Sequence, residues 1–471
     1  MQINFISEKH KTPTRCRVCG CMGDKQIAII PSINNENHKQ LILIKCDNCG
    51  TLNYAGNDPV IGYLSNDIKS SFWWHYVQVG AGLTAMLEPL FALGKNARGS
   101  LLDVGCGFGY VADFWNKIEY GDAVGLEKAS YGTLGSELLG VTIHPKYYSE
   151  CSEISDMKFS IVYSSEVLEH IANPKEFILE ITHALADDGM LILTTPSSDA
   201  ISKKHNQSTI IGALSPYLHY FVASANGLEE LLKDCGYKHI KVYNSGTRLF
   251  AWASNTKLPA LETGKINWED YFTYLNKISK NNDPNVKSGA LYRLFKDSWN
   301  TGRIEVARDA FYNFEKVALD SFNLSLRYPD IKRYGQRKSA IDDLASNPAW
   351  YGCALLFGGM FIGHHEGDRK TKVRMIEAAV EILKNESENP IFSQFSQEAQ
   401  HFYPYAKKEI LIAYTEALHQ EISNIEDYKS NEWMQLRNSI FQIYEYGKSK
   451  VFKENKIHPF ERFKKLLHTA I

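Results

Sequence analysis

A glycine-rich turn that follows a short apolar strand constrains this chain more than any other feature. Residues 101–110 read Leu-Leu-Asp-Val-Gly-Cys-Gly-Phe-Gly-Tyr, so glycines alternate at positions 105, 107 and 109. Glycine adopts positive φ at little cost and lets the backbone approach a ligand closely. The amides that open a following helix suit polar or anionic groups. The turn therefore predicts a strand–turn–helix unit that binds a ligand, although many such turns carry two or three glycines for structural reasons alone.

A second strand places a carboxylate where a ribose would bind. Residues 123–126 are apolar, and Glu127 at their end lies 20 residues after Gly107. An acid at this point of a strand–helix–strand unit accepts both hydroxyls of a ribose. A nicotinamide-binding Rossmann domain would offer the same acid. The G-x-G-x-G spacing, and Asp103 two residues before the first glycine, favour another ligand.

A third segment, residues 159–174, contains Val167-Leu168-Glu169-His170 after an apolar strand. Together the three segments resemble the class I S-adenosylmethionine (SAM) methyltransferases, in which the fourth strand often ends in such a run. The resemblance implies an α/β fold with a Rossmann-like seven-stranded sheet and SAM as cofactor. It implies adenine contacts from residues 149–153, and it assigns the remaining cofactor contacts to Asp103, Gly105, Cys106, Gly107, Gly109, Tyr110, Glu127 and Ser165.

The hydrophobic pattern predicts alternating strands and helices, which indicates a parallel sheet with the ligand at its carboxyl edge. A helical lead-in at 71–93 either covers the cofactor with its aromatic residues or packs on the sheet. Strands are expected at 101–104, 123–127, 141–144, 159–164, 190–195, 239–243 and 249–253, and helices at 109–118, 130–138, 175–186 and 226–235. The last two strands, joined around Asn244-Ser245-Gly246, fit the antiparallel hairpin that closes a methyltransferase sheet.

Two C-x-x-C-G knuckles near the amino terminus predict a metal site. Cys16 and Cys19 form the first and Cys46 and Cys49 the second, with strands expected between them at 26–31 and 40–45. Four thiolates from two such turns complete a tetrahedral shell, as in structural Zn²⁺ sites that keep no bound water. A pair of disulfides is the alternative, and a reducing cytosol disfavours it. We expect a zinc ribbon with a structural ion.

The catalytic residues are expected at the carboxyl edge of the sheet. Methyl transfer from SAM requires in-line alignment and, for many acceptors, removal of a proton. His219 has a pKa suited to a general base, and the resemblance to sugar-acting methyltransferases implies a histidine in this stretch. Tyr220 and Tyr217 are its nearest helpers, and Glu166 ends the fourth strand beside the transferred methyl. His219 could equally hold its loop, and Glu169 and His170 are expected to stabilise theirs.

The acceptor is the least constrained part of the prediction. A zinc ribbon before a methyltransferase domain resembles enzymes that act on nucleotide-linked sugars, and also some ribosomal-RNA methyltransferases. The chain has 52 Lys and Arg against 54 Asp and Glu, and it lacks an Asn/Asp-Pro-Pro-aromatic motif after the fourth strand, so RNA is disfavoured. We expect methylation of oxygen or carbon on a sugar, nucleotide sugar or glycan in carbohydrate biosynthesis. An RNA methyltransferase, a small-molecule methyltransferase outside sugar metabolism and a non-catalytic SAM-binding module are the alternatives.

The 471 residues predict several domains. We expect a zinc ribbon at 1–60, the lead-in at 61–98, the methyltransferase domain at 99–256 and an α-helical domain at 257–471. The helical domain would bind the acceptor, another protein or a second copy, or would serve only as a structural cap. For the basic segment 448–465 a solvated helix is favoured over contact with an anionic membrane. Neither a signal peptide nor an 18-residue apolar run is present, so we expect a cytoplasmic protein.

Overall fold

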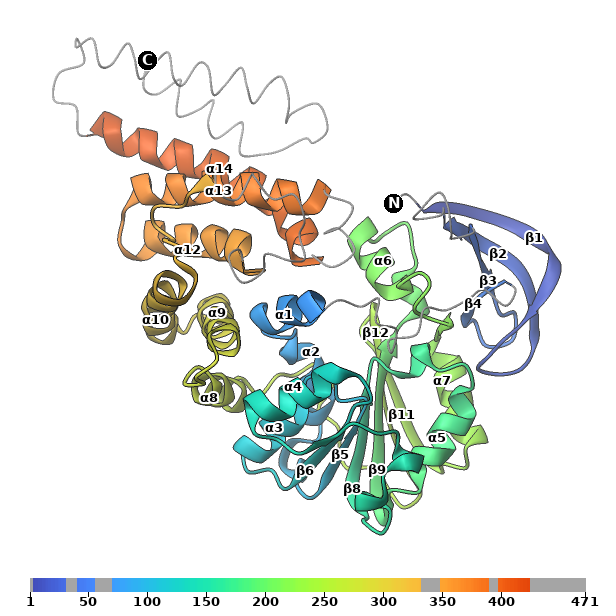
Figure 1. Cartoon of the computed structure of the whole chain (residues 1–471). Helices are drawn as coiled ribbons and strands as arrows, with labels where there is room; N and C mark the ends of the chain where they lie inside the picture. The colour runs from blue at the N-terminus through green and yellow to red at the C-terminus, as the bar shows by residue number, and fades with distance from the viewer. Residues whose placement is uncertain (1–2, 31–39, 56–69, 332–347, 389–396, 424–471) are drawn as a thin grey trace. The chain divides into compact units, whose positions relative to one another are not determined.

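The computed structural model describes residues 3–30, 40–55, 70–331, 348–388 and 397–423 (Figure 1). The described chain divides into two compact units. Of the described residues, the first unit contains those within 3–323, 348–350 and residue 397, and the second contains 324–331, 351–388 and 398–423. The predicted basic segment 448–465 lies outside the described residues.

A seven-stranded sheet is the centre of the first unit (Figure 1). Its order is β11-β12-β9-β8-β5-β6-β7, and the five strands from β9 to β7 are parallel. β12 is antiparallel to both of its neighbours. The strand bounds are Leu101–Val104 (β5), Ala123–Leu126 (β6), Ile143–His144 (β7), Phe159–Ser165 (β8), Leu185–Pro196 (β9), His239–Asn244 (β11) and Arg248–Ser254 (β12). All seven expected strands are present, and the methyltransferase fold is confirmed.

Helices cover both faces of this sheet because its strands are apolar on both sides. On one face, Leu102 and Val162 share a buried cluster with residues of α5 and α7. On the other face, the Tyr163 hydroxyl donates to the Met86 carbonyl of α2 at 2.6 Å. The helices of this part are Ser70–Gln78 (α1), Leu83–Phe91 (α2), Tyr110–Lys117 (α3), Ser130–Leu139 (α4), Pro174–Thr182 (α5), Gln207–Leu214 (α6) and Ala225–Asp234 (α7).

Several element boundaries differ from the sequence prediction, and β9 begins at Leu185 rather than at 190. Helix α5 ends at Thr182 rather than at 186, because Leu185 already pairs with Phe159 of β8. The lead-in is two helices, since the chain turns through positive φ at Gly80, Ala81 and Gly82. Helix α6 was not predicted, although Asn206 caps it by accepting a hydrogen bond from the Thr209 amide at 2.8 Å. Short 3₁₀ turns occupy Gly94–Asn96, Tyr148–Glu150, Ser152–Ile154, Leu168–His170 and Ser198–Ala200.

A second sheet contains the cysteine knuckles. Its order is β1-β2-β3-β4-β10, all antiparallel, with bounds Asn4–Arg15, Met22–Ile30, Leu41–Lys45, Leu52–Tyr54 and Phe221–Val222. β2 and β3 match the two predicted strands, whereas β1 and β4 were not predicted. β10 comes from the segment that follows His219, so the core domain contributes the last strand of this sheet.

Three further helices complete the first unit: α8 (Trp268–Ile278), α9 (Pro284–Asn300) and α10 (Ile304–Phe322). The Tyr274 hydroxyl donates to the buried Asp113 carboxylate of α3 at 2.8 Å. The Gln78 amide of α1 donates to Asn285 of α9 at 2.7 Å. Of these three helices, which the sequence assigns to the carboxyl-terminal domain, α8 and α9 are therefore bonded to α3 and α1, and α10 packs on α9.

The second unit is helical, with α12 (Tyr351–His365), α13 (Arg369–Glu388) and α14 (Gln397–Ser423). α12 and α13 pack as a hairpin around the turn at Gly367. Lys372 of α13 is buried and pairs with Glu409 and Glu416 of α14 at 2.8 and 3.0 Å. Within the described ranges, every helix is either too short or too polar to cross a membrane.

Candidate active site

The predicted turn between β5 and α3 adopts the conformation that its glycines allow. Gly105, Gly107 and Gly109 have φ of 72°, 59° and 88°. A Cβ atom on Gly105 would lie 2.5 Å from the Val167 side chain, so the turn packs directly against the loop after β8. Gly109 precedes the first residue of α3, which directs the amides of the turn and the helix toward one site.

Glu127, at the end of β6, is hydrogen-bonded to the glycine turn. Its carboxylate accepts from the Gly107 amide at 3.1 Å and from the Ala129 amide at 2.9 Å. Burial raises the pKa of Glu127, and these two amide hydrogen bonds act in the opposite direction. The acid and the turn that the sequence places 20 residues apart are thus one site.

Asp103 lies on β5, two residues before the first glycine of the turn. Its side chain is buried, and the residue is only 2% exposed. Burial, and then the charge of Glu127, raise the pKa of Asp103 to about 8. Tyr76 of the lead-in approaches the same site, with its ring centroid 6.2 Å from that of Tyr110 and its hydroxyl bonded to the Met86 sulfur. Cys106 lies in the turn, where burial raises the pKa of its thiol well above the usual value.

A group of polar side chains lies where the carboxyl ends of β8 and β9 are next to the start of β12. Glu166 has a left-handed backbone with φ of 56°. Its carboxylate accepts from Arg248 Nε at 3.0 Å and Nη2 at 3.4 Å, and from the Thr194 hydroxyl at 3.0 Å. Ser165 Oγ lies 2.7 Å from Thr194 Oγ1. Arg248 is a site residue that the sequence reasoning missed, because only the antiparallel register of β12 places it opposite Pro196 at this edge.

Glu169, His170 and His219 form a buried group next to this edge. His219 Nε2 and His170 Nε2 lie 3.9 and 4.0 Å from Glu169 Oε1. The two imidazole rings are nearly perpendicular, with centroids 4.5 Å apart. Burial lowers the pKa of both histidines and raises that of Glu169, and the charge of Glu166 raises the latter further. His219, the expected base, is only 4% exposed and touches residues for which the sequence predicts structural roles.

The two tyrosines beside His219 have different surroundings. Tyr217 is buried in the cluster between the second sheet and α6. Tyr220 is half-buried, its amide donates to the Glu169 carbonyl at 2.8 Å, and the guanidinium of Arg17 lies 4.8 Å from its ring centroid. Tyr220 is therefore the member of this pair closer to the Glu169–His170 turn.

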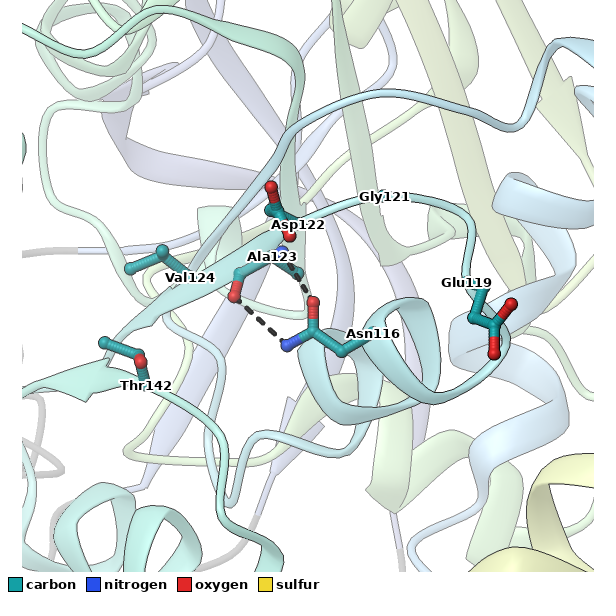
Figure 2. A pocket seen from close by; sticks show the side chains of 7 residues that line it. All are labelled: Asn116, Glu119, Gly121, Asp122, Ala123, Val124 and Thr142. Atoms are coloured by element: carbon teal, nitrogen blue, oxygen red, sulfur yellow. Dashed lines mark hydrogen bonds between the residues drawn. The ribbon is translucent and has the colours of Figure 1, made fainter.

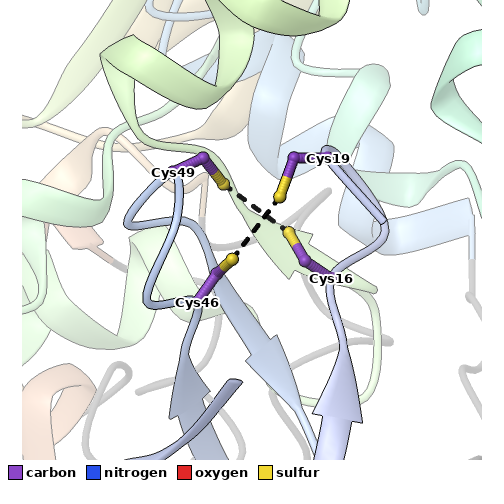
Figure 3. Close-up of side chains that lie close together, drawn as sticks. All are labelled: Cys16, Cys19, Cys46 and Cys49. Atoms are coloured by element: carbon purple, nitrogen blue, oxygen red, sulfur yellow. Dashed lines mark hydrogen bonds between the residues drawn. The ribbon is translucent and has the colours of Figure 1, made fainter. Parts of the chain in front are cut away.

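The four knuckle cysteines converge as predicted (Figure 3). Cys16 Sγ lies 3.7 Å from Cys49 Sγ, and Cys19 Sγ lies 3.5 Å from Cys46 Sγ. Four sulfurs at about 2.3 Å from a tetrahedral Zn²⁺ would be about 3.8 Å apart, so the arrangement fits such an ion. Burial raises the pKa of the Cys46 thiol to about 11, whereas bound Zn²⁺ requires thiolates. None of the described cysteines forms a disulfide.

A hollow lined by Asn116, Asp122, Ala123 and Thr142 lies at the amino end of β6 (Figure 2). The Asn116 amide is bonded to both backbone groups of Ala123, at 2.7 and 3.3 Å. This hollow is at the sheet edge opposite the glycine turn and contains none of the predicted site residues. The segment expected near adenine, 149–153, is formed by 3₁₀ turns in which Glu150 pairs with Lys128 at 2.6 Å.

Comparison with known proteins agrees with this geometry. Residues 73–242 match the model of a methyltransferase domain family. The tRNA U34 carboxymethyltransferases of Photobacterium profundum and Serratia proteamaculans are 27% and 28% identical over 178 and 155 residues, or 34% and 30% of this chain. The chain spans about half the length of these relatives, 53% and 46%.

Among solved structures, a Thermotoga maritima SAM-dependent methyltransferase, described as a possible histamine N-methyltransferase, is 15% identical. The match covers 39% of this chain and 93% of that one, with a TM-score of 0.31. The Haemonchus contortus phosphoethanolamine N-methyltransferase 2 in complex with SAM is also 15% identical, over 39% and 56% of the two chains, with a TM-score of 0.32. With the family match, the sheet and the glycine turn, residues 73–242 contain a methyltransferase domain.

Proposed function

We propose that this methyltransferase binds SAM across the carboxyl ends of β5 and β6 and methylates an oxygen or carbon of a sugar, nucleotide sugar or glycan. The observation that carries the cofactor assignment is the Glu127 carboxylate, which is bonded to the Gly107 amide and closes the glycine turn. In this arrangement Glu127 accepts the ribose hydroxyls, and Gly105, Gly107 and Gly109 face the methionine part. Asp103, Cys106, Tyr110 and Ser165 complete the proposed cofactor site.

The acceptor is proposed to bind where β8 and β9 end, beside the methyl group. Glu166, Thr194 and Arg248 offer hydrogen-bond acceptors and donors of the kind that sugar hydroxyls use. His219 is the predicted base there, with Tyr220 beside it. The buried carboxylates of this edge and the net charge of −2 disfavour a polyanionic acceptor.

An RNA acceptor is the second candidate, and the names of the two bacterial relatives favour it. Their match covers about a third of this chain. It concerns the methyltransferase domain, which would bind the cofactor whether the acceptor is a sugar or an RNA. We also propose that Cys16, Cys19, Cys46 and Cys49 hold a structural Zn²⁺, because the four sulfur atoms are spaced for such an ion.

Cofactor binding is tested by Glu127→Ala with S-adenosylhomocysteine (SAH) in isothermal titration calorimetry. Hydrogen bonds to a charged group contribute about 1.5–3 kcal/mol each, so affinity should fall by about tenfold to a hundredfold or more. Glu137→Ala, on the exposed side of α4, is the matched control and should bind like the wild type. Unchanged affinity in Glu127→Ala would contradict the assignment of the cofactor site.

The acceptor class is tested with SAM that carries a labelled methyl group, offered with nucleotide sugars, glycans or bulk tRNA. Label in the saccharide fraction supports the proposal. Label in tRNA alone would replace it with the RNA alternative.

A further inference from the structure

We propose that Arg17, in the first cysteine knuckle, binds a phosphate group of the acceptor, so that the acceptor is a nucleotide sugar. The proposal rests on the proposed function and selects one of its acceptor classes. Arg17 lies in the sequence between Cys16 and Cys19. Its guanidinium carbon is 4.8 Å from the ring centroid of Tyr220, which belongs to the core domain. The ribbon thus places a cation next to the edge where the acceptor is proposed to bind.

The guanidinium of Arg17 is held in place without being neutralised. Its Nη1 donates to the Ala172 carbonyl at 3.3 Å, and it lies over the ring of Tyr220. Among the described residues, no carboxylate forms an ion pair with Arg17, whereas the guanidinium of Arg248 is bonded to Glu166. Arginine has five N–H donors, so most of those of Arg17 are left for another acceptor. An aromatic ring beneath the guanidinium fixes its plane while its charge stays available to an anion.

The loop after β8 connects this cation to the proposed site of methyl transfer. Glu166 is the first residue of the loop, and Ala172, which accepts from Arg17, follows six residues later. Tyr220 is bonded to the same loop, because its amide donates to the Glu169 carbonyl at 2.8 Å. A ligand that lies along the loop would have one end beside Glu166 and the other at Arg17. A nucleotide sugar has this form, since neutral sugar hydroxyls are followed by a charged diphosphate.

The charge of the ribbon favours a diphosphate over other anions. Its described residues, 3–30 and 40–55, contain six Lys and Arg against three Asp and Glu, whereas the whole chain has a net charge of −2. Local positive charge raises the local concentration of anionic ligands, and a diphosphate carries more negative charge than a carboxylate. Phosphate oxygens also match the two-pronged geometry of a guanidinium. A surplus of three charges suits one diphosphate better than the extended backbone of an RNA.

The test is isothermal titration calorimetry on the full chain with Zn²⁺ at the cysteines and SAH bound. The ligands are UDP, GDP, CDP and dTDP, each compared with its nucleoside, so that the difference reports the diphosphate alone. At least one diphosphate is expected to bind. Arg17→Ala should weaken that binding by about tenfold to a hundredfold, as the loss of charge-assisted hydrogen bonds does. Arg15→Ala, at an exposed arginine of the same ribbon, is the matched control and should bind as the wild type does.

A second variant separates anion binding from a structural role. Arg17→Gln keeps an N–H donor for the Ala172 carbonyl but removes the charge. It should melt closer to the wild type than Arg17→Ala does and still bind the diphosphate as weakly as Arg17→Ala. The Zn²⁺ content and melting temperature of each variant show whether the ribbon remains folded. In turnover with the matching nucleotide sugar, the loss should appear as a higher KM with little change in kcat, because Arg17 does not touch the transferred methyl.

Three outcomes would overturn the proposal. If no diphosphate binds to the wild type, or if Arg17→Gln binds it as the wild type does, Arg17 is only a contact between the ribbon and the core. If no diphosphate binds and tRNA binds in a manner that depends on Arg17, the acceptor is an RNA instead. SAH affinity is measured on the same samples. Failure to bind SAH would contradict the proposed function itself, and it is distinguishable from failure of the diphosphate site.

Discussion

At the scale of single residues, the buried Asp103 links cofactor binding to pH. Its pKa is raised from 3.8 to about 8, mainly by burial. Between those two values the free folded protein holds a proton on Asp103 that an exposed aspartate would have lost. The cationic methionine part of SAM, which we place at the adjacent glycines, favours the ionised carboxylate.

Binding should therefore release a proton, and SAM affinity should rise with pH up to about 8, where Asp103 is already ionised in the free protein. Calorimetry in two buffers that differ in ionisation enthalpy measures the proton release directly. Asp103→Asn, which is nearly isosteric, should abolish most of the release near neutral pH. Release that persists unchanged in this variant would show that another group is titrating.

Single site residues could be predicted from the sequence where a motif fixes both their spacing along the chain and their backbone conformation. The glycines at 105–109 and Glu127 are bonded in one site because a strand–helix–strand unit brings positions 20 residues apart to one sheet edge. Arg248 and the contact between Glu169 and His219 had no such signal. They depend on the register of β12 and on the path of the chain between β9 and β10.

At the scale of elements, the position of α4 depends on a glycine that no motif marks. A Cβ atom on Gly135 would lie 2.0 Å from the Phe108 carbonyl oxygen, a backbone atom of the glycine turn. Helix α4 and the turn are thus in direct contact, and α4 cannot carry a side chain at this point without moving.

Gly135→Ala should destabilise the protein by about 1–3 kcal/mol, as overpacking generally does. It should also weaken SAH binding, because the displaced turn carries the Gly107 amide. Thr133→Ala, on the exposed side of the same helix, is the control. Thermal melting and calorimetry measure both effects, and a variant with normal stability and affinity would contradict the predicted close contact.

The order of strands and helices in the core could be predicted because it depends on local sequence. Short apolar runs predict the strands, and amphipathic segments between them predict the helices. All seven core strands were predicted, whereas β1, β4, β10 and α6 were not. β10 has two residues, and it exists only because β4 offers an edge to pair with. The end of α5 was misplaced for a similar reason, since pairing of Leu185 with Phe159 overrides local helix propensity.

At the scale of the whole molecule, the cysteine knuckles and the proposed acceptor site are physically joined within the first unit. Arg17 of the first knuckle donates to the Ala172 carbonyl at 3.3 Å and covers the ring of Tyr220. Ser224, two residues after β10, donates to the Cys49 carbonyl. Three of the cysteines belong to the same buried cluster as the core sheet.

Loss of the proposed Zn²⁺ should therefore affect more than the ribbon. Chelation, or Cys46→Ser, should lower the melting temperature of the first unit and reduce turnover through the Tyr220 segment. Structural Zn²⁺ sites contribute about 10–16 kcal/mol of binding free energy, so we expect a large effect. Cys21→Ser, an exposed cysteine outside the cluster, should change neither quantity. A chelated protein with full stability and activity would show that the ribbon does not need a metal.

The sequence alone determined the fold class of the core domain and the order of its strands along the chain. It also determined that the glycine turn and Glu127 form one site and that the four knuckle cysteines converge. Each depends on short-range spacing that local physics translates into structure. Tertiary structure decided the rest: that β10 joins the ribbon sheet to the core, that α8 and α9 bond to α3 and α1, and that two histidines converge on Glu169. These contacts join segments up to 207 residues apart, as between Gln78 and Asn285, and only packing brings such segments together.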